Sequence, residues 1–257
     1  PYTTLFRSIE AVRRQFEALR PRREIAKRQI DGSELDMDAL IRSRCDLAAT
    51  GDATDRVYQQ ARDAARDLAV AVLIDVSRST EAYVENRQVL DIAKESLSAL
   101  TLGLTACGDE HALYSFSSCK RDRVWVQTIK AFAEPVDHSV HARIAHLRPG
   151  YYTRLGAAIR HVAAALRERP NQRRLLLVLT DGKPNDLDHY EGRYGVEDTA
   201  MAVREARRLG HAVFGITIDR KAHAYFPHMF GQNAFAIIAH IGALTRALPL
   251  IYRHMVG

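Results

Sequence analysis

The sequence has few cysteines and no long apolar run. Cys45, Cys107 and Cys119 are too few and too widely spaced for a disulfide framework, and the CxxC spacing of common zinc sites is missing. We expect reduced structural thiols, with zinc bound by Cys107, His111 and Cys119 as a weaker alternative. The longest apolar runs, such as LAVAVLI and LLLVL, are far shorter than the roughly 20 residues of a spanning helix, which predicts no direct membrane insertion.

An export signal is also missing, because no apolar segment with a small-residue cleavage site stands at the N-terminus. We therefore expect a cytoplasmic protein, and Pro1 in place of Met indicates a fragment of a longer chain. Of the 257 residues, 47% are hydrophobic and 26% are charged, which is the ordinary balance of a globular protein.

The net charge of +6 leaves room for an acidic partner. Residues 13–28, RRQFEALRPRREIAKR, carry seven Arg or Lys side chains against two Glu. Such a stripe could bind RNA or DNA phosphates. Because aromatic residues do not interleave with the charges, we favour a solvated helix face or a protein-docking patch and expect no nucleic-acid partner.

The first 55 residues predict a small helical segment. Apolar residues recur at helical spacing over 4–19, Pro21 interrupts them, and a second short helix is expected to residue 30. A further helix is expected from a cap at Ser33 to Gly51, and GDAT at 51–54 fits a linker. We predict a helical arm over 1–55, part of a truncated upstream region, and a second domain over 56–257.

From residue 68 onward, strands and helices alternate in the order βαββαβαβα, with a last helix over 244–255. The runs LAVAVLI and LLLVL are apolar almost throughout, which is typical of strands covered on both faces by crossover helices. The predicted class is α/β, a doubly wound, mostly parallel sheet with helices on both faces.

Small oxygen-bearing side chains follow the predicted strands. VAVLIDVSRST supplies Asp75, Ser77 and Ser79, the turn PGYYTRLG supplies Thr153, and LLLVLTDG supplies Asp181. Ligands bind beyond the carboxyl ends of parallel strands, so these side chains should meet there. Carboxylates mixed with hydroxyls suit Mg²⁺, with Mn²⁺ as an alternative. Taken singly, each residue also fits a helix cap or a turn.

The DxSxS motif at 75–79, the later Thr153 and TDG at 180–182 resemble the metal-ion-dependent adhesion site of von Willebrand factor type A domains. The resemblance implies that Ser77, Ser79 and Thr153 bind the ion while Asp75 and Asp181 act mostly through water. It also implies an open position for an acidic partner residue. Many members have Gly where this chain has Arg78, which would either narrow the site or grip that residue.

A narrower resemblance is carried by SFSSCKRDRVWVQTIKAF, LRPGYYTRLGAAIRH, LLLVLTDGKPNDLDHYEGRYGVEDT and YFPHMFGQNAFAI. These segments are similar to the C-terminal part of the NorD family of nitric oxide reductase activation proteins and to the related CbbO rubisco activase subunits. The resemblance implies a non-catalytic adaptor of a MoxR-family AAA+ ATPase. Its target would be nitric oxide reductase or, alternatively, rubisco.

The segment GKPNDLDHYEGRYGVEDT at 182–199 is long and polar for a connection between a strand and a helix, so it is either a docking surface or a solvated insert. The candidate partner-binding residues are Arg78, Tyr152, Asp186, His189, Tyr190 and Arg193. A hydrolase using Asp75 as nucleophile is a weaker alternative, because Ser77 stands where such sites place a second acid.

Overall fold

The computed structural model describes residues 23–63, 67–84, 86–217 and 219–237. The chain divides into two units: Arg20–Arg66 forms the smaller one, and all described residues from Asp67 onward belong to the larger one. The boundary between the units therefore lies after Arg66 and not at the predicted 55/56. The reason is that β3 (Tyr58–Asp63) pairs with strands of the smaller unit.

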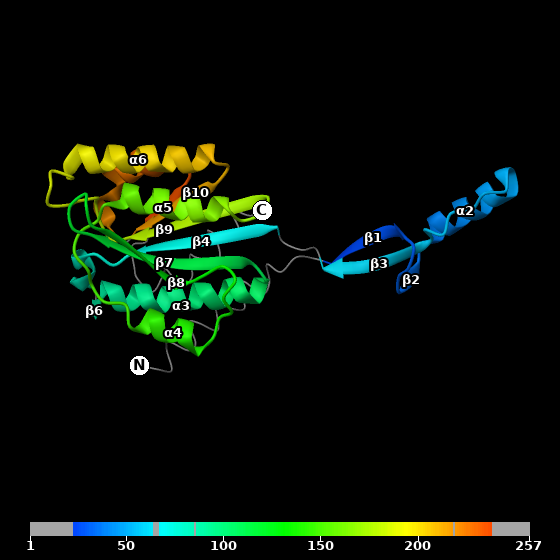
Figure 1. Ribbon diagram of the computed structural model, residues 1–257, viewed down its shortest axis with the longest axis horizontal. Helices are drawn as coiled ribbons and strands as arrows, with labels where there is room; N and C mark the ends of the chain where they lie inside the picture. Colours follow the sequence, from blue (N-terminus) through cyan, green and yellow to red (C-terminus); the bar gives the residue numbers. More distant parts are fainter. Residues whose placement is uncertain (1–22, 64–66, 85, 218, 238–257) are drawn as a thin grey trace. The chain divides into compact units, whose positions relative to one another are not determined.

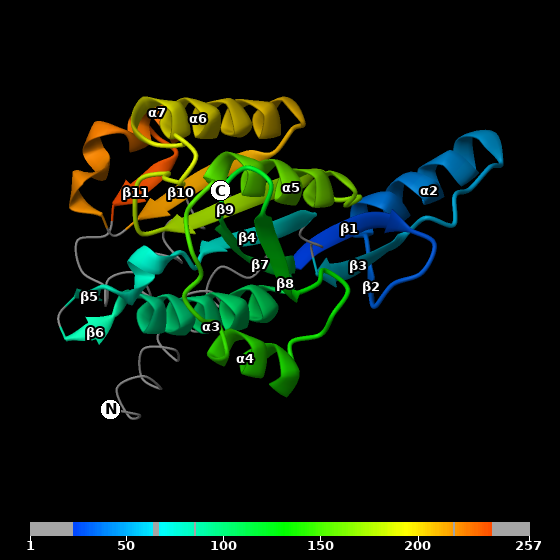
Figure 2. The same cartoon turned by 60° about the vertical axis from the view of Figure 1, so that its left-hand side comes forward.

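A six-stranded sheet forms the centre of the larger unit (Figures 1 and 2). Its strands are β4 (Leu68–Asp75), β7 (Glu110–Ser118), β8 (Val124–Lys130), β9 (Arg173–Thr180), β10 (Ala212–Thr217) and β11 (Phe235–Ile237). The order is β11-β10-β9-β4-β7-β8, and only β8 runs antiparallel to its neighbour. This arrangement confirms the predicted doubly wound sheet.

Helices cover both faces of this sheet. In Figure 1, α3 (Val89–Cys107) and α4 (His138–Ala145) lie on one face, and α5 (Leu155–Arg167) and α6 (Gly192–Arg208) lie on the other. Alternate residues of β4 enter two separate cores. Val70, Val72 and Ile74 pack with α3, whereas Ala69 and Leu73 pack with α5 and α6. Burial on both faces explains why β4 is apolar almost throughout.

Several short elements complete the larger unit: η1 (Arg78–Glu81), β5 (Tyr83–Val84), β6 (Arg87–Gln88), η2 (Arg220–Ala224) and α7 (Phe226–Phe230). The helices α4 and α7 were not predicted from the sequence. The sequence does contain an N-cap residue for α4, Asp137, whose side chain accepts hydrogen bonds from Ser139 N and Val140 N. The helix expected over 244–255 lies outside the described residues. Within the described part of the chain, no helix is both long and apolar enough to span a bilayer.

The smaller unit combines β1 (Arg23–Gln29), β2 (Glu34–Leu35), α2 (Met37–Thr50) and β3. The short helix expected after Pro21 is wrong, because β1 pairs antiparallel with β3. The cap expected at Ser33 is also wrong: Asp36 accepts a hydrogen bond from Ala39 N and begins α2. The predicted end of this helix at Gly51, with φ 81°, is confirmed. The helix expected over 4–19 lies outside the described residues.

Candidate metal centre

The candidate site lies where the strand order reverses, between β4 and β9. Asp75 is the last residue of β4, and Asp181 follows the last residue of β9 directly. The two strands are parallel neighbours, with Ile74 opposite Leu179, so both acids emerge at one edge. Crevices at such reversal points are the usual ligand sites of open α/β sheets.

Hydrogen bonds join all five predicted ligand side chains. Ser77 N donates to Asp75 Oδ1 at 2.8 Å, and the hydroxyls of Ser77 and Ser79 are 2.8 Å apart. Ser79 Oγ donates to Asp181 Oδ1 at 2.8 Å. Thr153 Oγ1 donates to Asp75 Oδ2 at 3.1 Å. Residues separated by up to 106 positions in the chain thus form one connected cluster of oxygens.

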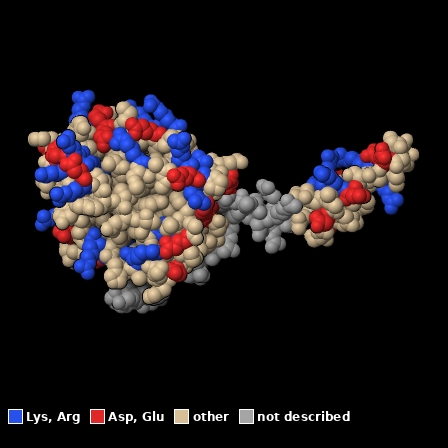
Figure 3. Space-filling model, in the orientation of Figure 1, with Lys and Arg blue, Asp and Glu red and all other residues tan. Residues whose placement is uncertain are grey.

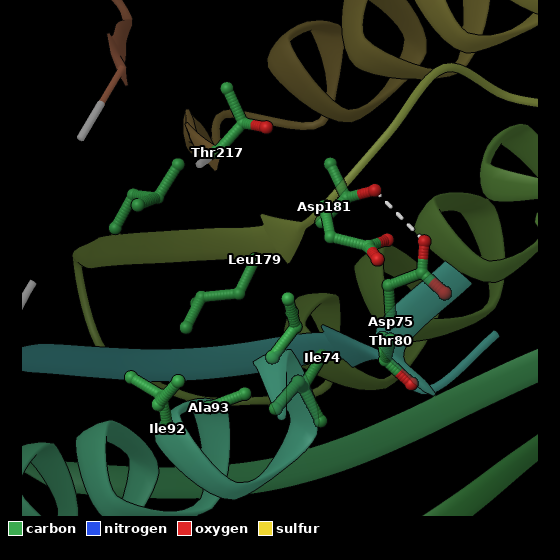
Figure 4. A pocket seen from close by; sticks show the side chains of 11 residues that line it. Ile74, Asp75, Thr80, Ile92, Ala93, Leu179, Asp181 and Thr217 are labelled. Atoms are coloured by element: carbon green, nitrogen blue, oxygen red, sulfur yellow. Dashed lines mark hydrogen bonds between the residues drawn. The ribbon is translucent and has the colours of Figure 1, made fainter. Parts of the chain in front are cut away.

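Thr180 also belongs to this cluster, although the sequence analysis did not select it. Its hydroxyl donates to Asp75 Oδ2 at 2.8 Å, drawn as the dashed line in Figure 4. The signal was its position at the end of β9, directly before Asp181. Thr80 does not join the cluster, because its hydroxyl donates to the Ser77 carbonyl at 2.6 Å.

The two carboxylates are placed where negative charge is poorly solvated. A small apolar pocket of about 40 Å³, lined by Ile74, Ile92 and Leu179, lies beside them (Figure 4). Burial raises the pKa of Asp75. Burial and then the nearby Asp75 raise the pKa of Asp181 to about 7. Two adjacent acids, the buried Asp75 and the half-buried Asp181, form a hard-oxygen donor set with the surrounding hydroxyls, which fits a divalent cation such as Mg²⁺.

The Arg78 side chain is exposed to solvent. Its exposed fraction is 80%, and Nε lies 3.8 Å from Glu81 Oε2. The Arg78 backbone N–H donates to the Tyr151 carbonyl at 2.9 Å, which fixes the loop. Both expected effects of Arg78, narrowing of the site and gripping of a partner's acidic residue, stay predictions.

Two of the expected partner-binding residues are buried instead. Asp186 is 3% exposed and Tyr190 is 1% exposed. The Asp186 carboxylate accepts hydrogen bonds from Ser118 Oγ, Lys120 N and Leu187 N, and the Tyr190 hydroxyl donates to Asp198. Direct partner contact was therefore the wrong role for these two side chains. They fold the connection between β9 and α6 onto the domain.

The cation at the centre of this arrangement, Arg154, was not predicted from the sequence. Arg154 Nε lies 3.4 Å from Asp186 Oδ2, its terminal nitrogen pairs with Asp188, and its guanidinium lies 4.1 Å from the Tyr190 ring centroid. Arg154 directly follows Thr153, so this ion pair also positions a candidate ligand. A pair separated by 32 positions leaves no periodic signal in a sequence.

The other candidate partner-binding residues remain available at the surface. His189 is exposed with φ 59°, Arg193 is 92% exposed beside Glu197, and Tyr152 is half-buried with its backbone bridged to Ser118. Their docking role stays a prediction.

The weaker zinc alternative gains no support. No group of three or more His, Cys, Asp and Glu side chains capable of holding a metal occurs in the part of the chain that the structure describes. His111 is buried, with Nδ1 2.9 Å from the Asp109 carbonyl.

The sheet order and the oxygen cluster define a protein class. The model of the von Willebrand factor type A domain matches residues 69–234, and the chain belongs to this family. It is 53% identical over 249 residues to Protein NorD of Brucella melitensis, covering 97% of this chain and 39% of that protein. Protein NorD of Stutzerimonas stutzeri is 48% identical over 228 residues, covering 88% of this chain and 37% of that protein.

The chain thus spans about two fifths of the length of these curated relatives, and the predicted resemblance to NorD is confirmed. Among solved structures, proximal thread matrix protein 1 from the mussel byssus, with a zinc-occupied MIDAS motif, has a TM-score of 0.55 and 17% identity. The match covers 72% of this chain and 46% of that one. At this identity it shows the fold alone.

Proposed function

We propose that this domain is a metal-dependent protein-interaction module of a NorD-like activation protein. It would work with a MoxR-family AAA+ ATPase in the cytoplasm to activate or remodel a target metalloenzyme. The observation that carries the proposal is the hydrogen-bonded cluster that joins Asp75, Ser77, Ser79, Thr153 and Asp181. The relatives named NorD favour nitric oxide reductase as the target over the rubisco alternative.

Each member of the cluster has a role that follows from its contacts. Ser77, Ser79 and Thr153 present neutral hydroxyls, while Asp75 and Asp181 present carboxylates. Mg²⁺, or Mn²⁺, held by these five side chains would supply a positive centre for an acidic side chain of the target. Thr180 and the Ser77 amide keep the Asp75 carboxylate oriented. The zinc-occupied motif of the mussel protein supports metal binding at this position of the fold.

We also propose a non-catalytic role, which the same residues support. Phosphoryl-transfer sites place an acid two positions after the nucleophilic Asp, and this chain has Ser77, whose hydroxyl is bonded to Ser79. Nucleic-acid binding also gains no support from the face of the larger unit in Figure 3, where Lys and Arg alternate with Asp and Glu. We therefore propose neither an enzyme nor a nucleic-acid partner.

The test is capture of purified nitric oxide reductase and MoxR-family ATPase on the immobilised chain, in Mg²⁺ and in EDTA. We expect capture of the reductase in Mg²⁺ only and its loss in Asp75→Asn, which removes one carboxylate charge from the cluster. Asp91→Asn is the matched control, because Asp91 is exposed on α3 beside Lys94. Capture that survives both EDTA and Asp75→Asn would refute the metal-dependent mechanism, and capture of rubisco instead would identify the alternative target.

A further inference from the structure

A groove of about 460 Å³ begins beside the metal centre and runs between β8 and α4. Val76, which stands between the candidate ligands Asp75 and Ser77, forms part of its wall. Gly150 lines it as well, and its N–H donates to the Val76 carbonyl at 2.5 Å. A chain bound at the metal centre could therefore continue into this groove, whose volume is that of an ordinary ligand site.

The charged side chains of the groove are cationic. Arg143 and Arg148 line it beside His146, and no Asp or Glu occurs among its described lining residues. Arg143 is compensated by an ion pair with Glu134. Arg148 is exposed and has neither an ion pair nor a side-chain hydrogen bond with any described residue. Arg148 is therefore the free cation that an acidic ligand would meet.

A buried hydroxyl in the groove wall also lacks a partner. Ser115 is 1% exposed, and its Oγ has no hydrogen-bond partner among the described residues. Buried polar groups are nearly always paired, since an unmade hydrogen bond costs free energy. A ligand that reaches this wall can supply the missing partner. The unpartnered Ser115 hydroxyl thus points to a ligand without reference to the charge on Arg148.

Two aromatic side chains form the exposed rim. Trp125 is 41% exposed and Tyr151 is 58% exposed, with ring centroids 5.6 Å apart. Tyr151 accepts the backbone hydrogen bond from Arg78, so the rim is connected directly to the metal-site loop. Exposed Trp, Tyr and Arg are the residues that contribute most to protein interfaces.

We propose that this groove binds an acidic peptide segment of the same partner that presents a carboxylate to the metal centre. The inference rests on the proposed function for the identity of the partner, but the groove's affinity for acidic peptide does not require the metal. Arg148 pairs with a second carboxylate of the segment, and Ser115 forms a hydrogen bond with one of its polar groups. Trp125 and Tyr151 pack against the apolar part of the segment. Two anchors on one segment raise its effective concentration at each.

Trp125 is the single tryptophan of the chain, so its fluorescence reports occupancy of the groove. The probe is hexaglutamate, with hexaglutamine as the uncharged control, titrated at low salt in EDTA and then in Mg²⁺. We expect a saturable change with hexaglutamate in EDTA and tighter binding in Mg²⁺. Arg148→Gln should weaken binding in EDTA by up to about fivefold, the upper end for an exposed ion pair. Arg204→Gln, an equal charge change on the exposed surface of α6, should leave binding unchanged.

The outcomes separate the groove from the metal centre. Absence of a saturable response, or equal weakening by Arg148→Gln and Arg204→Gln, would overturn the groove proposal. Tighter binding of decathymidylate than of hexaglutamate would overturn it in favour of a nucleic acid. Asp75→Asn should keep binding in EDTA and lose the gain in Mg²⁺. If the unmodified chain binds in EDTA without any gain in Mg²⁺, the groove proposal stands and the metal-dependent function fails.

Discussion

The buried pair between Arg154 and Asp186 offers a sharp test of how the loop at 182–191 is held. The Asp186 side chain is 0% exposed, and the Arg154 side chain is 11% exposed. Besides Arg154, the carboxylate accepts Ser118 Oγ at 2.8 Å and the backbone N–H groups of Lys120 and Leu187 at 2.7 Å. Such a pair stabilises a fold only while both partners are present.

Each single substitution removes one partner of the buried pair. Arg154→Met leaves the carboxylate with hydroxyl and amide donors but no cation, and Asp186→Asn leaves the guanidinium with Asp188 alone among acids. We expect each to lower the free energy of unfolding by about 3 kcal/mol, the lower limit for breaking a buried pair. The double variant removes both charges and should also lose about 3 kcal/mol. The coupling energy is then about 3 kcal/mol.

Urea unfolding followed by circular dichroism measures all four members of this double-mutant cycle. Arg193→Met is the control. The Arg193 side chain is 92% exposed beside Glu197, so this substitution should lower the free energy of unfolding by less than about 0.5 kcal/mol. If the losses of the two single variants add up to the loss of the double variant within about 0.5 kcal/mol, the assigned pairing is refuted, because the effects of independent sites are additive.

Three further perturbations probe the centre, a buried histidine and the packing of β10. Mg²⁺ at 100 times its dissociation constant should raise the free energy of unfolding by about 2.7 kcal/mol, and Asp181→Asn should abolish most of that gain in thermal unfolding with and without EDTA. Burial lowers the pKa of His111 to about 4, so the unfolded chain takes up the proton first as the pH falls from about 6.5. The stability of the unmodified chain relative to His111→Gln, measured by urea unfolding, should therefore fall by about 3 kcal/mol between pH 7 and 4. Gly215→Ala should lower the free energy of unfolding by about 2 kcal/mol in the same assay, because the added Cβ would lie 2.7 Å from the Phe230 ring. Gly182→Ala is the control, because a Cβ added there meets no atom within 4 Å.

The candidate ligands could be selected from the sequence because they follow apolar strands of a parallel sheet. Once LAVAVLID and RRLLLVLT are taken as neighbouring parallel strands, Asp75 and Asp181 must emerge at one edge. Thr153 could be added because it precedes a helix directed to the same edge. From the sequence, Thr180 could be predicted only as a strand residue, because the direction of its hydroxyl depends on packing.

The remaining differences come from contacts between distant segments. REIAKRQ consists mostly of good helix formers, yet it is strand β1, because its partner β3 supplies the hydrogen bonds from residues 58–63. Propensity is a weak prior that tertiary pairing overrides. Asp186 was taken for a surface residue because acids are rarely buried, and the compensating Arg154 lies 32 positions earlier.

The buried pair also connects the metal centre to the exposed part of the loop. Thr153 N donates to the Asn185 carbonyl at 2.8 Å, and Asn185 N donates to the Thr153 carbonyl at 3.1 Å. Asp186 and Tyr190 then anchor the chain on either side of His189, which is exposed with φ 59°. A partner that contacts His189 therefore meets a surface already ordered by its own buried contacts. Less conformational entropy is lost on binding to such a surface, which favours a docking role for this loop over that of a solvated insert.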